Sequence, residues 1–155
     1  MNDKIAKYEL LLKQMAEFND LEIPNSGKIC SILSLLKDSL DLFWIGLYMK
    51  TNENTLGLGI YQGLPACTLI PYGKGVCGTA AATAQVQIVD DVTTFPGYIA
   101  CHAEAASEIV LPGFKQGNVS FVLDVDSKEI AAFNNTDALY LGKVVNILET
   151  LLLEP

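Results

Sequence analysis

Residues 107–126, SEIVLPGFKQGNVSFVLDVD, contain the clearest β-hairpin pattern in the chain. Two apolar runs, 107–115 and 119–126, lie on either side of the turn-forming residues Gln116-Gly117-Asn118. Apolar runs separated by a short Gly-containing turn are typical of two antiparallel strands that pair locally. The pattern therefore predicts an antiparallel sheet, and the rest of the fold is interpreted around it.

The second strand of this hairpin has two different faces. Phe121, Leu123 and Val125 alternate with residues that include Asp124 and Asp126. Because successive side chains of a strand point to opposite faces of the sheet, the apolar set can pack on helices. Both carboxylates are then predicted to project from the other face.

The pairing register decides whether a third acid, Glu108, joins these two. A three-residue loop pairs Lys115 with Val119, and the same register places Glu108 opposite Asp126. A two-residue loop would shift the register by one and turn Glu108 to the other face. We predict the three-residue loop, and with it a cluster of Glu108, Asp124 and Asp126.

Three clustered acids have two interpretations. Acids on a solvated sheet face are the commoner case, whereas acids within so apolar a hairpin are costly unless they bind something. A hard metal ion such as calcium and an ammonium group both suit oxygen ligands of this kind. Crowded carboxylates also repel one another, so at least one of them can hold a proton at neutral pH and act as a general acid.

The remaining sequence completes an α+β pattern. Apolar spacing predicts helices at 4–17, from 24–26 to 40 and at 79–84, a final helix capped by Asn135-Thr136-Asp137, and strands at 43–49, 56–61 and 87–89. Locally joined hairpins with helices on one side are typical of the α+β class. The Gly- and Pro-rich segment 62–101 is predicted to form long loops, which often carry functional residues.

Composition limits the classes of function. The 155 residues are 50% hydrophobic and 18% charged, which predicts one packed domain spanning residues 1–155. The net charge is −8, and all ten cationic side chains are Lys, so neither nucleic acid nor an anionic membrane is an expected partner. No apolar run reaches the roughly 20 residues of a membrane span, and no signal peptide is evident, so we expect a cytoplasmic protein. The apolar terminal helices leave a homodimer open.

The four cysteines admit three roles: buried apolar side chain, metal ligand or redox group. Cys30 follows the apolar periodicity of its helix and is predicted to lie in the core. Cys67, Cys77 and Cys101 lie in the loop-rich segment. They and His102 contain no closely spaced ligand pair of the kind that zinc sites use, and His102 is interpreted as a polar loop residue. In a redox pair, a second thiol resolves the oxidised form of the first as a disulfide.

Several motifs occur in a definite order along the chain. They are FWIGLY at 43–48, LGIYQGLPAC at 58–67, GKGVCGTA at 73–80, IAC at 99–101, SEIVLP at 107–112 and VLDVDS at 122–127. Together they resemble the free methionine-(R)-sulfoxide reductases that are built on a GAF domain. The resemblance implies a GAF fold, with a central antiparallel sheet of about six strands flanked by helices.

The resemblance also implies an activity. Members of the family reduce free L-methionine-(R)-sulfoxide to methionine and are recycled by a thioredoxin-type reductant. By the family pattern, Cys101 is the catalytic nucleophile, Cys67 is its disulfide partner, and Cys77 is a third cysteine of the catalytic set. We expect no metal and no cofactor.

Four further residues match the substrate pocket of the family. Glu108, Asp124 and Asp126 match its acids, and Trp44 matches its aromatic wall. The chain has no Arg, so backbone N–H groups of the Gly-rich loops are expected to hold the substrate carboxylate. Two other classes remain open at this point: a non-catalytic GAF sensor of a small ligand, and a protein with a zinc or structural-thiol site.

Overall fold

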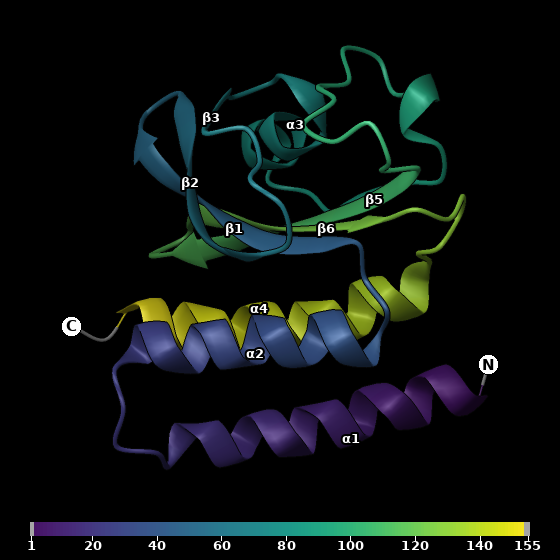
Figure 1. Cartoon of the computed structure of the whole chain (residues 1–155). Helices are drawn as coiled ribbons and strands as arrows, with labels where there is room; N and C mark the ends of the chain where they lie inside the picture. Colours follow the sequence, from purple (N-terminus) through teal and green to yellow (C-terminus); the bar gives the residue numbers. More distant parts are fainter. Residues whose placement is uncertain (1, 154–155) are drawn as a thin grey trace.

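A central sheet separates two unlike sides of the molecule. The computed structural model describes residues 2–153 and, as Figure 1 shows, places α2 and α4 beneath the sheet, α1 beneath them, and α3 with the long loops above it. The helices are α1 (Asn2–Asn19), α2 (Asn25–Ser39), α3 (Gly75–Thr83) and α4 (Asn135–Leu153), with a short 3-10 helix at Val92–Thr94. The strands are β1 (Trp44–Asn52), β2 (Thr55–Gln62), β3 (Leu69–Pro71), β4 (Gln87–Val89), β5 (Ser107–Lys115) and β6 (Asn118–Ser127).

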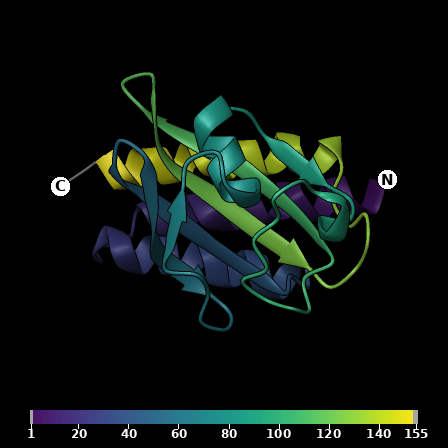
Figure 2. The same ribbon diagram turned by 90° about the horizontal axis from the view of Figure 1, so that it is seen from above.

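All neighbouring strands of the sheet are antiparallel. Their order is β3-β2-β1-β6-β5-β4, so the β5–β6 hairpin lies beside β1 near the middle. Seen from above, α3 and the loops lie over these strands (Figure 2). The predicted α+β class and the six-stranded antiparallel sheet are confirmed. No helix within residues 2–153 is long and apolar enough to cross a membrane.

The lower face of the sheet packs against α2 and α4, and α1 packs beneath those two helices. Phe121, Leu123 and Val125 are buried there in one core cluster with side chains from α1, α2 and α4. The predicted orientation of β6 is therefore confirmed, and its two aspartates face the opposite side. This arrangement leaves the upper face available for a polar site.

The turn of the hairpin differs from the prediction. Lys115 pairs with Asn118, so the loop consists of the two residues Gln116 and Gly117, and the predicted three-residue loop is wrong. Both loop residues have positive φ, 51° and 79°, which is the geometry of a tight hairpin turn with right-handed strand twist. The sequence gives no sign that Gln116 adopts a positive φ, because a non-glycine residue does so only uncommonly.

The predicted pairing of the acids is nevertheless confirmed. The register shifts by one residue between Gly113 and Phe114, and Glu108 lies opposite Asp126. Such a bulge adds one residue to one strand and so reverses the effect of the shorter loop. At Gly113 an added Cβ would collide with the ring of Phe121, so only glycine allows this close approach.

Two local predictions need correction. Cys30 is exposed rather than in the core, because the buried stripe of α2 follows Ile29, Ile32 and Leu33 and leaves position 30 outside it. The α4 helix is capped one residue earlier than predicted. Asn134 accepts a hydrogen bond from the backbone N–H of Thr136 at 2.8 Å.

Asp137 completes the start of α4 and ties it to α1. It accepts hydrogen bonds from the backbone N–H of Asn134 at 2.8 Å, from the Tyr8 hydroxyl at 2.7 Å and from the Lys4 ammonium at 2.6 Å. Its carboxylate thus satisfies an otherwise unpaired N–H at the helix start. The contact fixes the outer helix to the connection that follows β6.

Candidate functional site

A cavity lies on the upper face of the sheet, between α3, the loop before β5 and the strands β5 and β6. Its walls combine thiol, carboxyl, aromatic and aliphatic side chains. The lining residues are Ile70, Lys74, Gly75, Val76, Cys77, Tyr98, Ile99, Cys101, His102, Ala105, Glu108, Asp124 and Asp126. The cavity therefore contains five of the seven site residues that the sequence predicted.

The three predicted acids form one buried cluster. Glu108 on β5 and Asp124 and Asp126 on β6 are only 5–6% exposed. Oδ1 of Asp124 is buried without a hydrogen-bond partner among the described residues. A buried polar atom left unpaired in a cavity wall indicates a surface that is completed by a ligand or by water.

Burial and mutual repulsion change the acidity of this cluster. Burial raises the pKa of Glu108 well above its usual value, and the charges of Asp124 and Asp126 raise it further. Burial raises the pKa of Asp126 as well, with a further contribution from Asp124. Burial also raises the pKa of Asp124, to about 6. The three groups are therefore not all ionised at neutral pH, and the cluster can both hold a cation and donate a proton.

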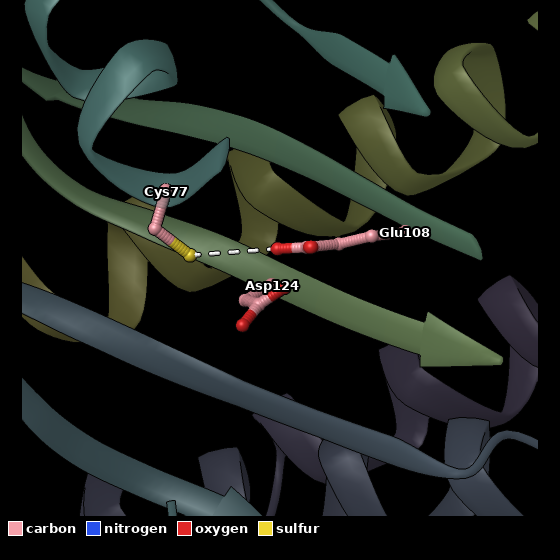
Figure 3. Close-up of side chains that lie close together, drawn as sticks. All are labelled: Cys77, Glu108 and Asp124. Atoms are coloured by element: carbon pink, nitrogen blue, oxygen red, sulfur yellow. Dashed lines mark hydrogen bonds between the residues drawn. The ribbon is translucent and has the colours of Figure 1, made fainter. Parts of the chain in front are cut away.

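Cys77 reaches the same cluster from α3 (Figure 3). Its Sγ lies 3.9 Å from Oε1 of Glu108, and the side chain is buried. Burial, followed by the charge of Asp124, raises the pKa of the Cys77 thiol. The next residue, Gly78, lets α3 pack closely on the end of β3, because an added Cβ there would collide with the carbonyl oxygen of Pro71. Cys77 is therefore a protonated hydrogen-bond donor to the acids.

Cys67 and Cys101 are joined by a disulfide, with their Cα atoms 5.3 Å apart. They come from the β2–β3 connection and from the loop before β5, and both are partly buried. Two contacts hold these segments in place. His102 Nε2 lies 3.1 Å from the carbonyl oxygen of Pro65, and the Tyr48 hydroxyl donates to the carbonyl oxygen of Cys67 at 2.9 Å.

Trp44 lies beside the cavity rather than in its wall. It is buried on β1 next to Asp126 of β6, and its indole N–H donates to the carbonyl oxygen of Leu64 at 2.9 Å. Its ring centroid is 6.0 Å from that of His102, which does line the cavity. Trp44 therefore adjoins the aromatic side of the cavity through its packing near His102.

Three aromatic or cationic lining residues were not singled out as site residues by the sequence. Tyr98 and His102 provide the aromatic rings of the wall, and Lys74 provides its only cation among the described residues. Burial, followed by the charge of Glu108, raises the pKa of Tyr98, so its hydroxyl stays protonated. Tyr98 and His102 could have been identified by their closeness to Cys101 in the sequence, since Tyr98 precedes it by three residues and His102 follows it directly.

The arrangement can perform two kinds of chemistry. Ligand atoms of Cys77, Glu108 and Asp124 all lie within 4.8 Å of one another, so the acids can hold a small cation, either a metal ion or an ammonium. The disulfide can exchange with thiols, and once reduced it presents a nucleophilic sulfur to the cavity.

Comparison with known proteins identifies relatives. No family model matches the chain. It is 42% identical over 146 residues to GAF domain-containing protein A of Dictyostelium discoideum, covering 94% of this chain and 92% of the relative. It is 46% identical over 112 residues to the free methionine-R-sulfoxide reductase of Escherichia coli, covering 72% of this chain and 67% of the relative.

A solved structure of a protein with the same name as the second relative matches this chain along nearly its whole length. The free methionine-R-sulfoxide reductase from Neisseria meningitidis, solved in complex with its substrate, superposes with a TM-score of 0.89 at 40% identity. The match covers 96% of this chain and 89% of that one. With this identity, this fold and the family's motifs in their order, the chain belongs to the family of GAF-domain free methionine-(R)-sulfoxide reductases.

Proposed function

We propose that the chain, acting as a single GAF domain over residues 1–155, reduces free L-methionine-(R)-sulfoxide to L-methionine. The observation that carries this proposal is the position of Cys101. Its sulfur is bonded to Cys67, and the residue lines a cavity whose wall contains three buried acids. A nucleophile, a resolving thiol and an acid cluster are the groups that sulfoxide reduction by cysteine needs. The relatives that carry this name support the assignment of substrate.

The acid cluster explains why a free amino acid would be preferred. The ionised members of the cluster hold the substrate ammonium through charge-assisted hydrogen bonds. A methionine sulfoxide inside a peptide chain has no such ammonium, and it would leave the buried carboxylates without a partner. The substrate carboxylate is held by Lys74 and by the backbone N–H groups at the start of α3, in the Gly-rich segment that lines the cavity.

The aromatic side of the cavity accepts the S-methyl end of the substrate. The rings of Tyr98 and His102 line this side, and the Trp44 ring packs near that of His102. Contacts between sulfur and aromatic rings are favourable. In this arrangement Trp44 contributes to substrate binding by shaping the wall that the substrate contacts.

The chemical step transfers the sulfoxide oxygen to Cys101. A protonated acid of the cluster donates its proton to the sulfoxide oxygen, which makes the sulfur more electrophilic. The Cys101 thiolate then takes up the oxygen as a sulfenic acid, and methionine leaves. The cysteine sulfur is oxidised by two electrons and the sulfoxide sulfur is reduced by two.

Recovery of the enzyme uses the second cysteine. The Cys67 thiol attacks the sulfenic sulfur of Cys101, which forms the disulfide and releases water. A thioredoxin-type dithiol then reduces the disulfide, so that no metal or cofactor takes part. Cys77 lines the same cavity and donates its S–H to Glu108, and we include it in the catalytic set through this contact.

The test is a coupled assay that follows NADPH oxidation in the presence of thioredoxin and its reductase. Turnover is expected with the free (R)-sulfoxide and not with the (S)-epimer or with a peptide-bound sulfoxide. Cys101→Ser should abolish turnover, and Cys67→Ser should form about one methionine per chain and then stall. The matched control is Cys30→Ser, a change at an exposed free cysteine, which should keep full activity. Activity that persists in Cys101→Ser would contradict the proposal.

A further inference from the structure

The segment around Cys67 has an unusual composition for a protein surface. Residues 54–73 contain no charged side chain, although 28 of the 155 residues of the chain are charged. Within this segment, Leu64 is 58% exposed and Leu69 is 64% exposed. Exposed apolar side chains together with a lack of charge are typical of the centre of a protein–protein interface.

These two leucines lie close to the disulfide. Leu64 precedes Cys67 by three residues and Leu69 follows it by two. Because consecutive Cα atoms are about 3.8 Å apart, both Cα atoms are within about 11 Å of that of Cys67. A standard interface covers about 800 Å² per partner, which is a disc of about 16 Å radius. A protein that reaches the sulfur of Cys67 therefore covers both leucines.

The fold presents this segment at a free boundary of the sheet. Leu69 begins β3, which pairs only with β2 in the described sheet and forms its edge. Ile70 is buried beneath it and anchors the strand, while Leu69 and Pro71 face outward. The surface is thus held in a fixed shape, which lowers the entropy cost of binding a partner.

The two sulfur atoms of the disulfide differ in their surroundings. Cys101 lines the acid-walled cavity, whereas the partly buried Cys67 is not among the lining residues and lies within segment 63–69, whose other residues except Ala66 are exposed. An attacking thiolate is an anion, and this chain carries a net charge of −8. Approach through the uncharged segment avoids repulsion by the acids near Cys101.

We propose that the uncharged segment Gly63–Leu69 is the docking surface for a dithiol reductase of the thioredoxin type, which attacks Sγ of Cys67. This inference rests on the proposed function in assuming that the disulfide is turned over. The reductase thiolate forms a mixed disulfide with Cys67 and releases the Cys101 thiolate. A second reductase thiol then attacks the reductase sulfur of the mixed disulfide and releases the Cys67 thiolate, so the dithiol is oxidised as the protein disulfide is reduced.

The first test measures reduction of the oxidised protein in the absence of any sulfoxide. The rate constant with reduced thioredoxin is compared with the rate constant with dithiothreitol, a small reductant that needs no docking surface. The double variant Leu64→Ser/Leu69→Ser should react about tenfold more slowly with thioredoxin, which corresponds to about 1.4 kcal/mol. Its rate with dithiothreitol should stay within about twofold of the parent.

The matched control is Leu139→Ser, which removes a leucine that is 61% exposed on α4 on the opposite side of the sheet. It should react with thioredoxin at the parent rate. An unchanged thioredoxin rate in the double variant would overturn the proposal, as would an equal loss with dithiothreitol or with the control. A changed sedimentation coefficient with an unchanged thioredoxin rate would show that the surface joins copies of this chain, which also overturns it.

The second test locates the attacked sulfur. Thioredoxin whose second active-site cysteine is replaced by serine should be trapped as a mixed disulfide on Cys67, with Cys101 free for alkylation. Trapping on Cys101 would overturn the proposal. Neither measurement uses a sulfoxide. If this chain fails to reduce methionine sulfoxide, the proposed function is disproved, but the docking surface can still be tested.

Discussion

The substitution Asp124→Asn should stabilise the fold at neutral pH while removing part of the binding site. Asp124 is 6% exposed, and its Oδ1 has no hydrogen-bond partner in the described part of the chain. Burial raises the pKa of its carboxyl group from 3.8 to about 6. The folded state therefore binds this proton more tightly than the unfolded state does, and ionising Asp124 at higher pH weakens the fold.

The magnitude follows from the size of this shift. Two pKa units correspond to about 3 kcal/mol of free energy of unfolding. This stability is fully present below pH about 4, falls as the pH rises toward 6 and is lost above it. Asparagine does not ionise, so the variant does not suffer this loss. Removing the charge also relieves Glu108 and Asp126, whose raised pKa values owe part of their shift to it.

The assay is thermal unfolding of the oxidised protein at several pH values between 4 and 8. The variant should melt close to the parent at pH 4 and about 6–12 °C higher at pH 8, for a chain of this length. The control is Asp20→Asn, which changes an exposed aspartate directly after α1 and should show no such pH-dependent difference. A difference between variant and parent that does not grow with pH would refute the reasoning.

Three further outcomes can be measured. His102→Ala removes the contact with the carbonyl oxygen of Pro65, worth about 1 kcal/mol; disulfide formation after one turnover should slow about fivefold in rapid-quench experiments, and an unchanged rate would mean that the contact does not position the loops. Asp137→Asn weakens the charge-assisted hydrogen bonds that Asp137 accepts from Lys4 and Tyr8. The free energy of unfolding in urea should fall by about 2 kcal/mol, with an unchanged KM for the sulfoxide. Asp126→Asn removes a carboxylate that disfavours a thiolate nearby; iodoacetamide should alkylate Cys101 of the reduced protein several-fold faster at pH 7, and equal rates would show that the acids do not restrain this thiol.

Much of the fold was predictable because it depends on local patterns. The alternation in β6 identified the two faces of the sheet, and it placed Phe121 in the core and Asp124 opposite it. The bounds of β4 and β5 also agree with the prediction. The three-residue strand β3 was missed because such a short segment has no detectable periodicity.

The candidate site was predictable as a set of residues, but its geometry was not. The pairing of Glu108 with Asp126 was predicted correctly from an incorrect loop, because a bulge at Ser120 of β6 compensated for the shorter turn. The core position of Cys30 was predicted from helical periodicity, which does not distinguish the rim of an apolar stripe from its centre. The roles assigned to the site residues remain predictions, which the variants above test.

By itself, the sequence determined the α+β class, the faces of the central hairpin and the motifs that indicate the family, because each depends on neighbours along the chain. The pairing of Cys67 with Cys101, 34 residues apart, was implied by the family resemblance, and the structure contains this disulfide. Only the tertiary structure decided that Cys77 on α3 comes within 3.9 Å of Glu108. It also placed Trp44 near His102 but outside the set of residues that line the cavity. The physical reason is that contacts between distant segments depend on how whole elements pack, and no local pattern encodes that packing.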